Sequence, residues 1–241
     1  MRREELKRNE LGEVLEAGIH YAEGHKKPLL LAIGAAVALV LAVWGWFAFS
    51  GSRREGANEL LTRALRVQEA EVVASGAKPD DPQTPTFASA AARDARANEL
   101  WTELDDRYGG TSIGRVAKLY MADAALTAGD AAKARSLWEG YLKSDDRSPV
   151  ALSAYVNLFE LDRQEGKGEP LAEKLRAMLE DPARPLPADL LLYQLALTYD
   201  QLDRPGDAAA TYRRIVDEHP QSPYYATAQQ HSASAAAGGP A

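Results

Sequence analysis

The sequence contains no cysteine and only four histidines, and these absences exclude several kinds of site. Without thiols there are no disulfide bonds, thiolate metal ligands or cysteine nucleophiles. The histidines include no i,i+4 pair and no HExxH pattern; they are His20, His25, His219 and His231. We therefore predict that the chain holds no metal ion and no cofactor.

Residue patterns typical of enzymes are also missing. No glycine-rich phosphate-binding loop occurs, and Gly109-Gly110 is predicted to end a helix. The carboxylate pairs Asp80-Asp81, Asp105-Asp106 and Asp145-Asp146 fall in predicted loops or at helix ends, where solvated side chains are expected. Nothing in the spacing of Ser, His and Asp indicates a nucleophile elbow. We predict no catalytic residues and no small-molecule substrate.

Positive charge is in deficit only after residue 50. The chain has 28 Lys and Arg against 35 Asp and Glu, which gives a formal net charge of −7. Segment 1–27 contains six bases and six acids, and the next 23 residues contain neither. All of the net negative charge therefore lies in the C-terminal part. An acidic domain argues against nucleic-acid binding, which needs cationic surface to neutralise phosphate.

One long uncharged run, PLLLAIGAAVALVLAVWGWFAFS, covers residues 28–50. As a helix it would extend about 34 Å, enough to cross a hydrocarbon core of about 30 Å. A cleaved signal peptide is the alternative, but its apolar region is normally about 7–15 residues long. We predict an uncleaved transmembrane helix over 28–50, in contact with a lipid bilayer.

Charge on either side of this run indicates a direction. Six Lys and Arg residues precede it. The basic residues that follow it within 20 positions are Arg53, Arg54, Arg63 and Arg66. The positive-inside rule thus favours a cytoplasmic N-terminus and a C-terminal domain on the other side. Aromatic residues at the far end of the run are typical of an interfacial belt; they are Trp44, Trp46, Phe47 and Phe49.

Segment 1–27 is predicted to form an amphipathic cytoplasmic helix. Its apolar residues recur at steps of three and four; they are Leu11, Val14, Leu15, Ile19 and Ala22. We expect the helix to lie at the inner leaflet. A helix that docks on a partner is the alternative.

The chain after residue 50 is predicted to be all-α and built from repeats. The unit from Asp189 to Pro220 resembles the tetratricopeptide repeat (TPR) consensus. Counted from Asp189, the small residues Ala196 and Ala208 stand at positions 8 and 20, and the larger Tyr199 and Tyr212 at 11 and 24. Small residues let the helices of one pair approach closely, and larger ones fill the space against the next pair.

A second unit starts near Arg115 and indicates the repeat length. Its small residues at positions 8, 11 and 20 are Ala122, Ala125 and Ala134, with Trp138 at position 24. Ala97 precedes Ala134 by 37 residues, and Ala208 follows it by twice that number, so a degenerate unit is expected near 171. We predict about four helix pairs over 51–231, of which 54–73 is the first helix. A capping helix is predicted over 223–230 and a disordered tail over 232–241.

The first helix of each TPR pair lines the concave face of an array, which predicts a binding surface. In the two clearest units, positions 2, 5, 9 and 12 are Val116, Leu119, Asp123, Leu126, Leu190, Tyr193, Leu197 and Asp200. We predict that this face binds an apolar or amphipathic segment of a partner, framed by the two aspartates. The alternative is that these apolar residues are interior, covered by neighbouring pairs or by the C-terminal segment.

The whole arrangement resembles the ancillary SecYEG translocon subunit family, whose TPR-like domain is shared with cell-division coordinator proteins. The resemblance lies in the opening RREELKRNELGEVLE, in HKKP directly before the apolar run, and in the TPR units. It implies a single-pass protein of the bacterial inner membrane with a cytoplasmic N-terminus and a periplasmic C-terminal domain. It also implies protein partners among translocon subunits and periplasmic chaperones.

The resulting functional prediction is a non-enzymatic interaction scaffold near the translocon. The alternative is an envelope structural protein, or a coordinator of cell division or outer-membrane assembly, that uses the same TPR domain. A membrane-tethered enzyme is a third alternative.

Overall fold

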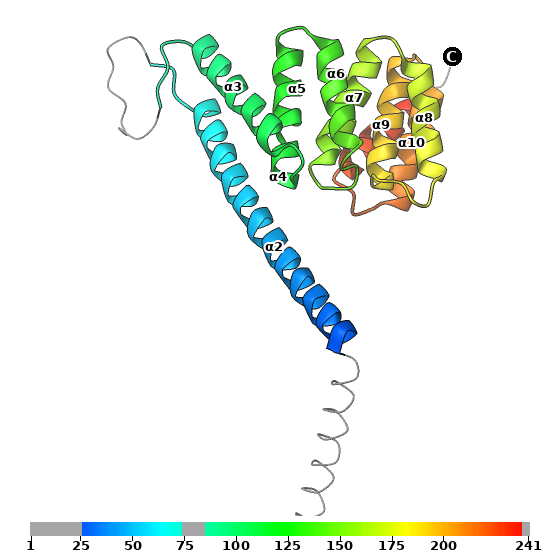
Figure 1. The fold of residues 1–241 in the computed structure, drawn as a ribbon. Coiled ribbons are helices and arrows are strands. Elements are labelled where there is room, and N and C mark those ends of the chain that lie inside the picture. The colour runs from blue at the N-terminus through cyan, green and yellow to red at the C-terminus, as the bar shows by residue number, and fades with distance from the viewer. Residues whose placement is uncertain (1–25, 74–84, 238–241) are drawn as a thin grey trace, which may run out of the picture. The chain divides into compact units, whose positions relative to one another are not determined.

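The computed structural model describes the backbone of residues 26–73 and 85–237 (Figure 1). The predicted amphipathic helix falls almost entirely within residues 1–25, outside the described residues. The stretch SGAKPDDPQTP, which its prolines and glycine predict to be a polar loop, falls mainly within 74–84, also outside them. The chain divides into two compact units, 1–56 and 57–241, which are treated separately below.

The first described helix, α2, runs from Lys26 to Gln68 and contains the apolar run. Its side chains from 35 to 46 are exposed, including Leu39 at 68% and both Trp44 and Trp46 at 70%. In the described part of the chain, one helical segment is long and apolar enough to cross a membrane: the part of α2 from Ala35 to Gln68. The helix does not end at the predicted boundary of residue 50, because the single Gly51 that follows costs too little to break it.

The second unit is helical, as the repeats predict. After the end of α2 come α3 (Ala90–Tyr108), the short α4 (Ser112–Arg115), α5 (Ala117–Thr127), α6 (Ala131–Leu142), α7 (Ala151–Gln164), α8 (Gly168–Glu180), α9 (Ala188–Gln201), α10 (Pro205–Glu218) and α11 (Tyr225–Ala237). Among the described residues, the β-structure consists of one isolated bridge between Val72 and Phe87. The all-α prediction is therefore confirmed.

Three turns inside helix pairs repeat at the predicted spacing. Gly129, Gly166 and Asp203 have φ values of 82°, 72° and 57° and are each 37 residues apart. The N–H of the following residue donates to a carbonyl five residues earlier in each case, over 2.8, 2.8 and 2.9 Å. This left-handed closure with its 6→1 hydrogen bond is a common helix C-terminus, and glycine adopts it without strain. Equivalent positions can thus be compared across the repeats.

The hydrophobic core follows the same period. Trp101, Trp138, Leu175 and Tyr212 stand 37 residues apart, and each is 2% exposed or less. The preceding small positions Ala97, Ala134 and Ala208 are also buried. At the degenerate unit the equivalent residue is the larger Leu171, 1% exposed, so the pattern predicted the helix there although the residue type changed.

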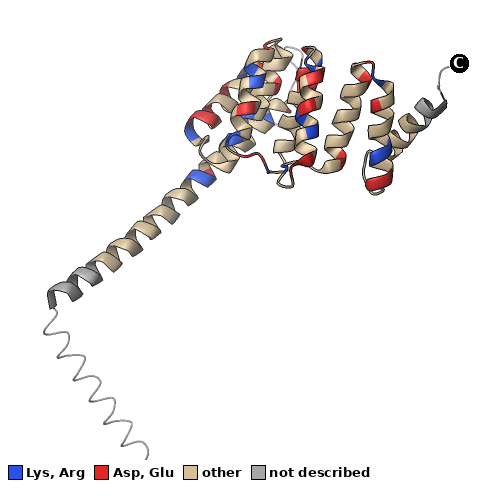
Figure 2. Cartoon of the chain, turned by 90° about the vertical axis from the view of Figure 1, so that its right-hand side faces the viewer, with Lys and Arg blue, Asp and Glu red and all other residues tan. Residues whose placement is uncertain are grey.

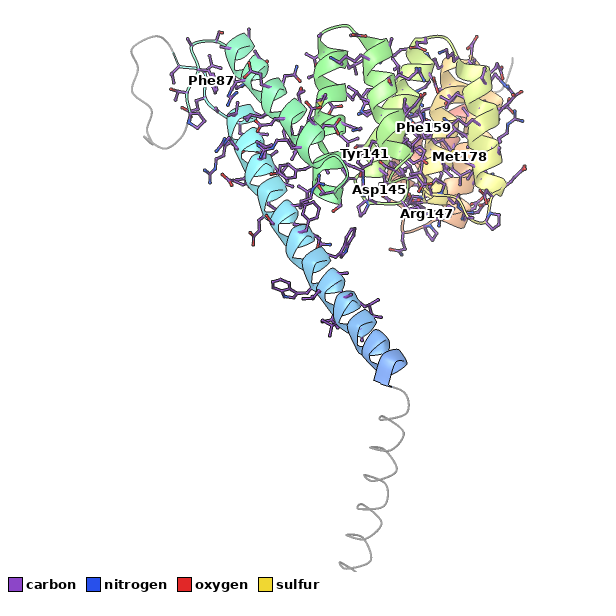
Figure 3. All side chains as sticks on the ribbon, in the orientation of Figure 1. Phe87, Tyr141, Asp145, Arg147, Phe159 and Met178 are labelled. Carbon is purple, nitrogen blue, oxygen red and sulfur yellow. The ribbon has the colours of Figure 1, made fainter. Side chains whose placement is uncertain are left out.

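The first helix pair is joined by contacts on both sides of the segment 74–84. Trp101 of α3 donates a hydrogen bond from Nε1 to Oε1 of Gln68 at the end of α2, over 3.1 Å. The N–H of Phe87 donates to the carbonyl of Glu71, and Val73 donates to the carbonyl of Phe87, which is labelled in Figure 3. The bridge therefore brings the two ends of this segment together.

The C-terminal helix is longer than the sequence predicts. Helix α11 continues to Ala237, whereas disorder is predicted from Ser232. The stretch SASAAA is rich in alanine, which has the highest helix propensity, and this favours continuation of the helix. The prediction of disorder is wrong for 232–237, and 238–241 lie outside the described residues.

Candidate protein-interaction surface

The predicted concave-face residues differ in exposure. Leu119 and Leu190 are core residues, 6% and 2% exposed. Three others are half-buried: Val116, Tyr193 and Leu197. The exposed ones are Asp123, Leu126 and Asp200. The two buried leucines agree with the alternative that such residues belong to the interior. The remaining six residues form a smaller candidate binding surface than the eight predicted.

Asp123 joins neighbouring helix pairs. Its Oδ1 accepts a hydrogen bond from Nδ2 of Asn157 on α7, over 3.3 Å. Although the residue is exposed at the edge of α5, partial desolvation raises the pKa of its carboxyl group, and a hydrogen bond from Trp138 lowers it to a smaller extent. Asp123 therefore has an intramolecular role besides any role in binding.

Tyr193 is covered by the chain's own C-terminal segment. Its ring stacks on Tyr224 with centroids 4.3 Å apart and an interplanar angle of 12°. It also meets the edge of Tyr212, whose hydroxyl donates to Oδ2 of Asp200 over 2.8 Å. Burial and the Asp200 carboxylate raise the pKa of Tyr212. This cover corresponds to the alternative in which the C-terminal segment occupies the last part of the concave face.

A groove that the sequence reading missed lies between α3 and α5. Its volume is about 740 Å³. The α5 side consists of Met121, Ala124, Ala125 and Ala128. The α3 side carries Ala95, Asn98, Glu99, Thr102, Glu103, Asp106 and Arg107, and the start of α6 adds Asp130 and Lys133. One feature of the sequence points to this groove: position 11 of the second unit is the small Ala125, whereas position 11 of the last unit is Tyr199.

Two contacts hold α3 and α5 together beside this groove. The rings of Trp101 and Tyr120 stack with centroids 4.1 Å apart and an interplanar angle of 1°. Lys118 forms an ion pair with Asp105. The groove therefore lies between two helices that are fixed to each other.

One member of each described carboxylate pair, Asp105 or Asp145, makes a contact within the domain. Asp145 accepts a hydrogen bond from the N–H of Ser148 over 3.1 Å in the segment after α6, where Figure 3 labels Asp145. Arg147, labelled nearby, donates to the carbonyl of Ala183 over 3.0 Å. Asp80-Asp81 lies outside the described residues. Within the described ranges, no group of three or more His, Asp or Glu side chains could hold a metal ion.

Comparison with known families agrees with the repeat geometry. Residues 27–184, more than half of the chain, match the model of the tetratricopeptide repeat-like domain. The chain belongs to the tetratricopeptide repeat-like domain family. Residues 191–222 also match a tetratricopeptide repeat model, which covers the unit identified from Asp189 to Pro220. No curated protein matches the sequence.

The family match establishes the general class of activity. TPR-like arrays present extended surfaces made by stacked helix pairs, and such surfaces bind other proteins. The first match begins at residue 27, so the apolar part of α2 and the first helix pairs fall within one family domain. The chain is a TPR-like protein-interaction module that carries one apolar helix near its N-terminus.

Proposed function

We propose that this protein is a non-enzymatic scaffold, held in the bacterial inner membrane by α2. Its TPR-like domain would lie in the periplasm and contact translocon subunits and periplasmic chaperones. The observation that carries the proposal is the exposed apolar surface of α2 between residues 35 and 46, in a chain that also contains a TPR-like array.

The exposed apolar surface supports a membrane location. Leu39, Val40 and Leu41 are 68%, 64% and 61% exposed, and the apolar window of the helix has none of its residues buried. Figure 2 shows this part of α2 free of charged residues. Apolar area left in water costs about 25 cal/mol per Å², so a surface of this kind needs a cover, and a bilayer of about 30 Å provides one.

Residues near the end of the apolar run support an interfacial position there. Trp44 and Trp46 are each 70% exposed, as expected for side chains at the headgroup level. The guanidinium of Arg53 lies over the ring of Phe49, 5.6 Å from its centroid. The aromatic band followed by an arginine fits a helix that leaves the bilayer near Phe49. The excess of Lys and Arg before the run supports the cytoplasmic N-terminus.

Resemblance to the ancillary SecYEG subunits supports the choice of partners. We expect crosslinking of the full chain in native membranes, followed by mass spectrometry, to recover translocon subunits. Recovery of only cell-division or outer-membrane assembly proteins would reject the translocon role in favour of the envelope coordinator. A chain in which Leu39, Val40 and Leu41 are replaced by aspartate is the control, because it should leave the membrane and lose these crosslinks.

A further inference from the structure

The groove between α3 and α5 exists because side chains that fill or narrow the equivalent junctions are absent there. The 37-residue turn spacing places α3, α6 and α8 at the same position in successive pairs, and likewise α5, α7 and α9. Three junctions can therefore be compared residue by residue: α3–α5, α6–α7 and α8–α9.

At the α8–α9 junction, large and charged side chains fill the space. Tyr199 and Leu202 occupy the positions that Ala125 and Ala128 hold in the groove, 74 residues earlier. Tyr199 is 6% exposed, and the guanidinium of Arg204 lies 4.8 Å from its ring centroid. Arg204 also bonds Glu169 at the start of α8 over 3.2 Å. This junction is closed by an aromatic ring, a leucine and an ion pair.

The α6–α7 junction is narrowed in a different way, by an ion pair. Arg135, Asp162 and Glu165 stand 37 residues after Asn98, Ala125 and Ala128. Nη2 of Arg135 lies 2.8 Å from Oδ1 of Asp162 and 2.9 Å from Oε2 of Glu165. This ion pair crosses part of the equivalent space, and a smaller cavity of about 310 Å³ remains beside it, where Arg135, Glu139 and Leu158 stand 37 residues after the groove residues Asn98, Thr102 and Met121.

The α3–α5 junction has neither the aromatic ring with its arginine nor the ion pair that the other two junctions have. Its positions carry Asn98, Ala125 and Ala128, and Asp130 stands where Arg204 stands in the α8–α9 junction. The missing ring, leucine and arginine leave the groove of about 740 Å³. Four carboxylates and two basic side chains line it, so its charge is negative. The α8–α9 junction indicates which side chains would fill this groove: an aromatic ring, an aliphatic side chain and an arginine.

We propose that this groove is a docking site for a basic segment of a partner protein that inserts a bulky apolar or aromatic side chain. The inserted side chain would fill the volume that Tyr199 and Leu202 fill elsewhere, over the floor of Met121 and alanines. An arginine of the partner would meet Asp106 and Asp130. The net negative charge of the whole C-terminal part would steer a basic segment toward it. This assignment rests on the proposed role of the TPR-like domain in binding proteins.

Methionine methyl NMR tests the site directly. The chain has three methionines, of which Met121 lines the groove and Met178 lies on α8, as labelled in Figure 3. The probe is a 16-residue alanine-based helical peptide with one tyrosine, a leucine three residues later and two arginines. It is added to the full chain in zwitterionic nanodiscs, so that lipid does not attract the peptide. We expect the Met121 methyl signal to shift and the Met178 signal to stay in place.

Filling the groove should abolish binding. The double variant A125Y/A128L introduces the residues of the α8–α9 junction, and we expect at least about tenfold weaker peptide binding by fluorescence anisotropy, with helicity unchanged. The variant E99Q/D106N should weaken binding several-fold and reduce its salt dependence. Its matched control is E173Q/E180Q, which removes the equivalent exposed carboxylates of α8. A peptide with glutamates in place of its arginines should not bind.

Several results would overturn the assignment. One is a shift of the Met178 methyl signal without a shift of the Met121 signal. Another is unchanged affinity of a folded A125Y/A128L variant for the peptide. If that variant does not fold, the NMR result on the unaltered chain decides. Self-association of the unaltered chain that A125Y/A128L abolishes would identify a second copy as the occupant instead. If the peptide does not bind but the full chain crosslinks to translocon subunits, only the groove assignment is rejected. If the peptide binds but no translocon subunit is crosslinked, only the proposed partners are rejected.

Discussion

The guanidinium of Arg163 donates a hydrogen bond from Nη1 to Oε1 of Gln194 over 2.9 Å and joins α7 to α9. Both residues are buried, 7% and 4% exposed. Arg163 also bonds Glu160, and its backbone carbonyl accepts from Nε2 of Gln201 over 2.8 Å. This polar contact between the third and fourth helix pairs is therefore almost fully shielded from water.

Removal of the Arg163 side chain should destabilise the domain. The variant R163A leaves the buried Gln194 acceptor without its partner, and we expect a loss of about 2 kcal/mol in the free energy of unfolding. Urea denaturation followed by circular dichroism measures it. The control R213A removes an exposed arginine of α10 and should change stability by less than about 0.5 kcal/mol. Equal effects of the two variants would contradict the structural role of the Arg163 contact.

Two carboxylates should give opposite dependences of stability on pH. Hydrogen bonds from Arg163 and Gln164 lower the pKa of Glu160, whereas desolvation raises that of Asp123. Relative to the unaltered chain, E160Q should be less stable above the usual glutamate pKa of about 4.3, and this difference should disappear as the pH falls through the lowered value.

D123N should show the reverse sign. Ionised Asp123 disfavours folding, so its replacement should stabilise the chain once the pH rises above the usual aspartate pKa of about 3.9. The gain should increase until the pH exceeds the raised value in the folded state. Denaturation midpoints between about pH 3 and 7 measure both variants. The same sign for E160Q and D123N at pH 7 would contradict these assignments.

The stack of Tyr193 on Tyr224 should hold the C-terminal segment in place. Y224A removes the stack, and we expect faster amide hydrogen exchange in α11 with little change in α5 and α6. Y225A alters the next residue, a tyrosine outside this stack, and is the matched control. Unchanged exchange of α11 in Y224A would show that other contacts are sufficient to hold this helix.

The repeated turns predict opposite effects of adding and removing a side chain. G166A places a Cβ at a φ of 72° and should destabilise by about 1 kcal/mol. D203G removes a side chain at a φ of 57°, so it should be neutral or stabilising by up to about 1 kcal/mol. Thermal unfolding of both variants provides the measurement. Destabilisation by D203G as large as that by G166A would show that the Asp203 side chain outweighs its backbone strain.

Features that depend on local pattern could be predicted from the sequence. The alanine and aromatic spacing predicted the repeat of 37 residues, and the buried Trp101, Trp138, Leu175 and Tyr212 follow it. Helix existence and pairing were predicted for the same reason. The continuation of α2 past residue 50 was not predicted, because neither proline nor a strong cap separates the apolar run from the helical segment after it.

Features that depend on which tertiary neighbours a side chain contacts were harder to predict from the sequence. Ala125 stands at position 11, where the last unit has the larger Tyr199, and the sequence does not show whether a neighbouring side chain fills the space that the alanine leaves. The repeat position places Tyr193 on the concave face, but its stack on Tyr224 needs a contact across 31 residues that no local pattern specifies. Periodicity shows which face of a helix is apolar, and the tertiary arrangement decides what covers it.

The absence of cysteine allows a direct test of the central claim that α2 spans a membrane and separates the two ends of the chain. Single cysteines are introduced as E5C and Q229C in the full chain, and intact cells with a permeable outer membrane are treated with a membrane-impermeant maleimide. We predict that Q229C is labelled at once and that E5C is labelled only after lysis. Labelling of both positions in intact cells, or of E5C alone, would contradict the claim.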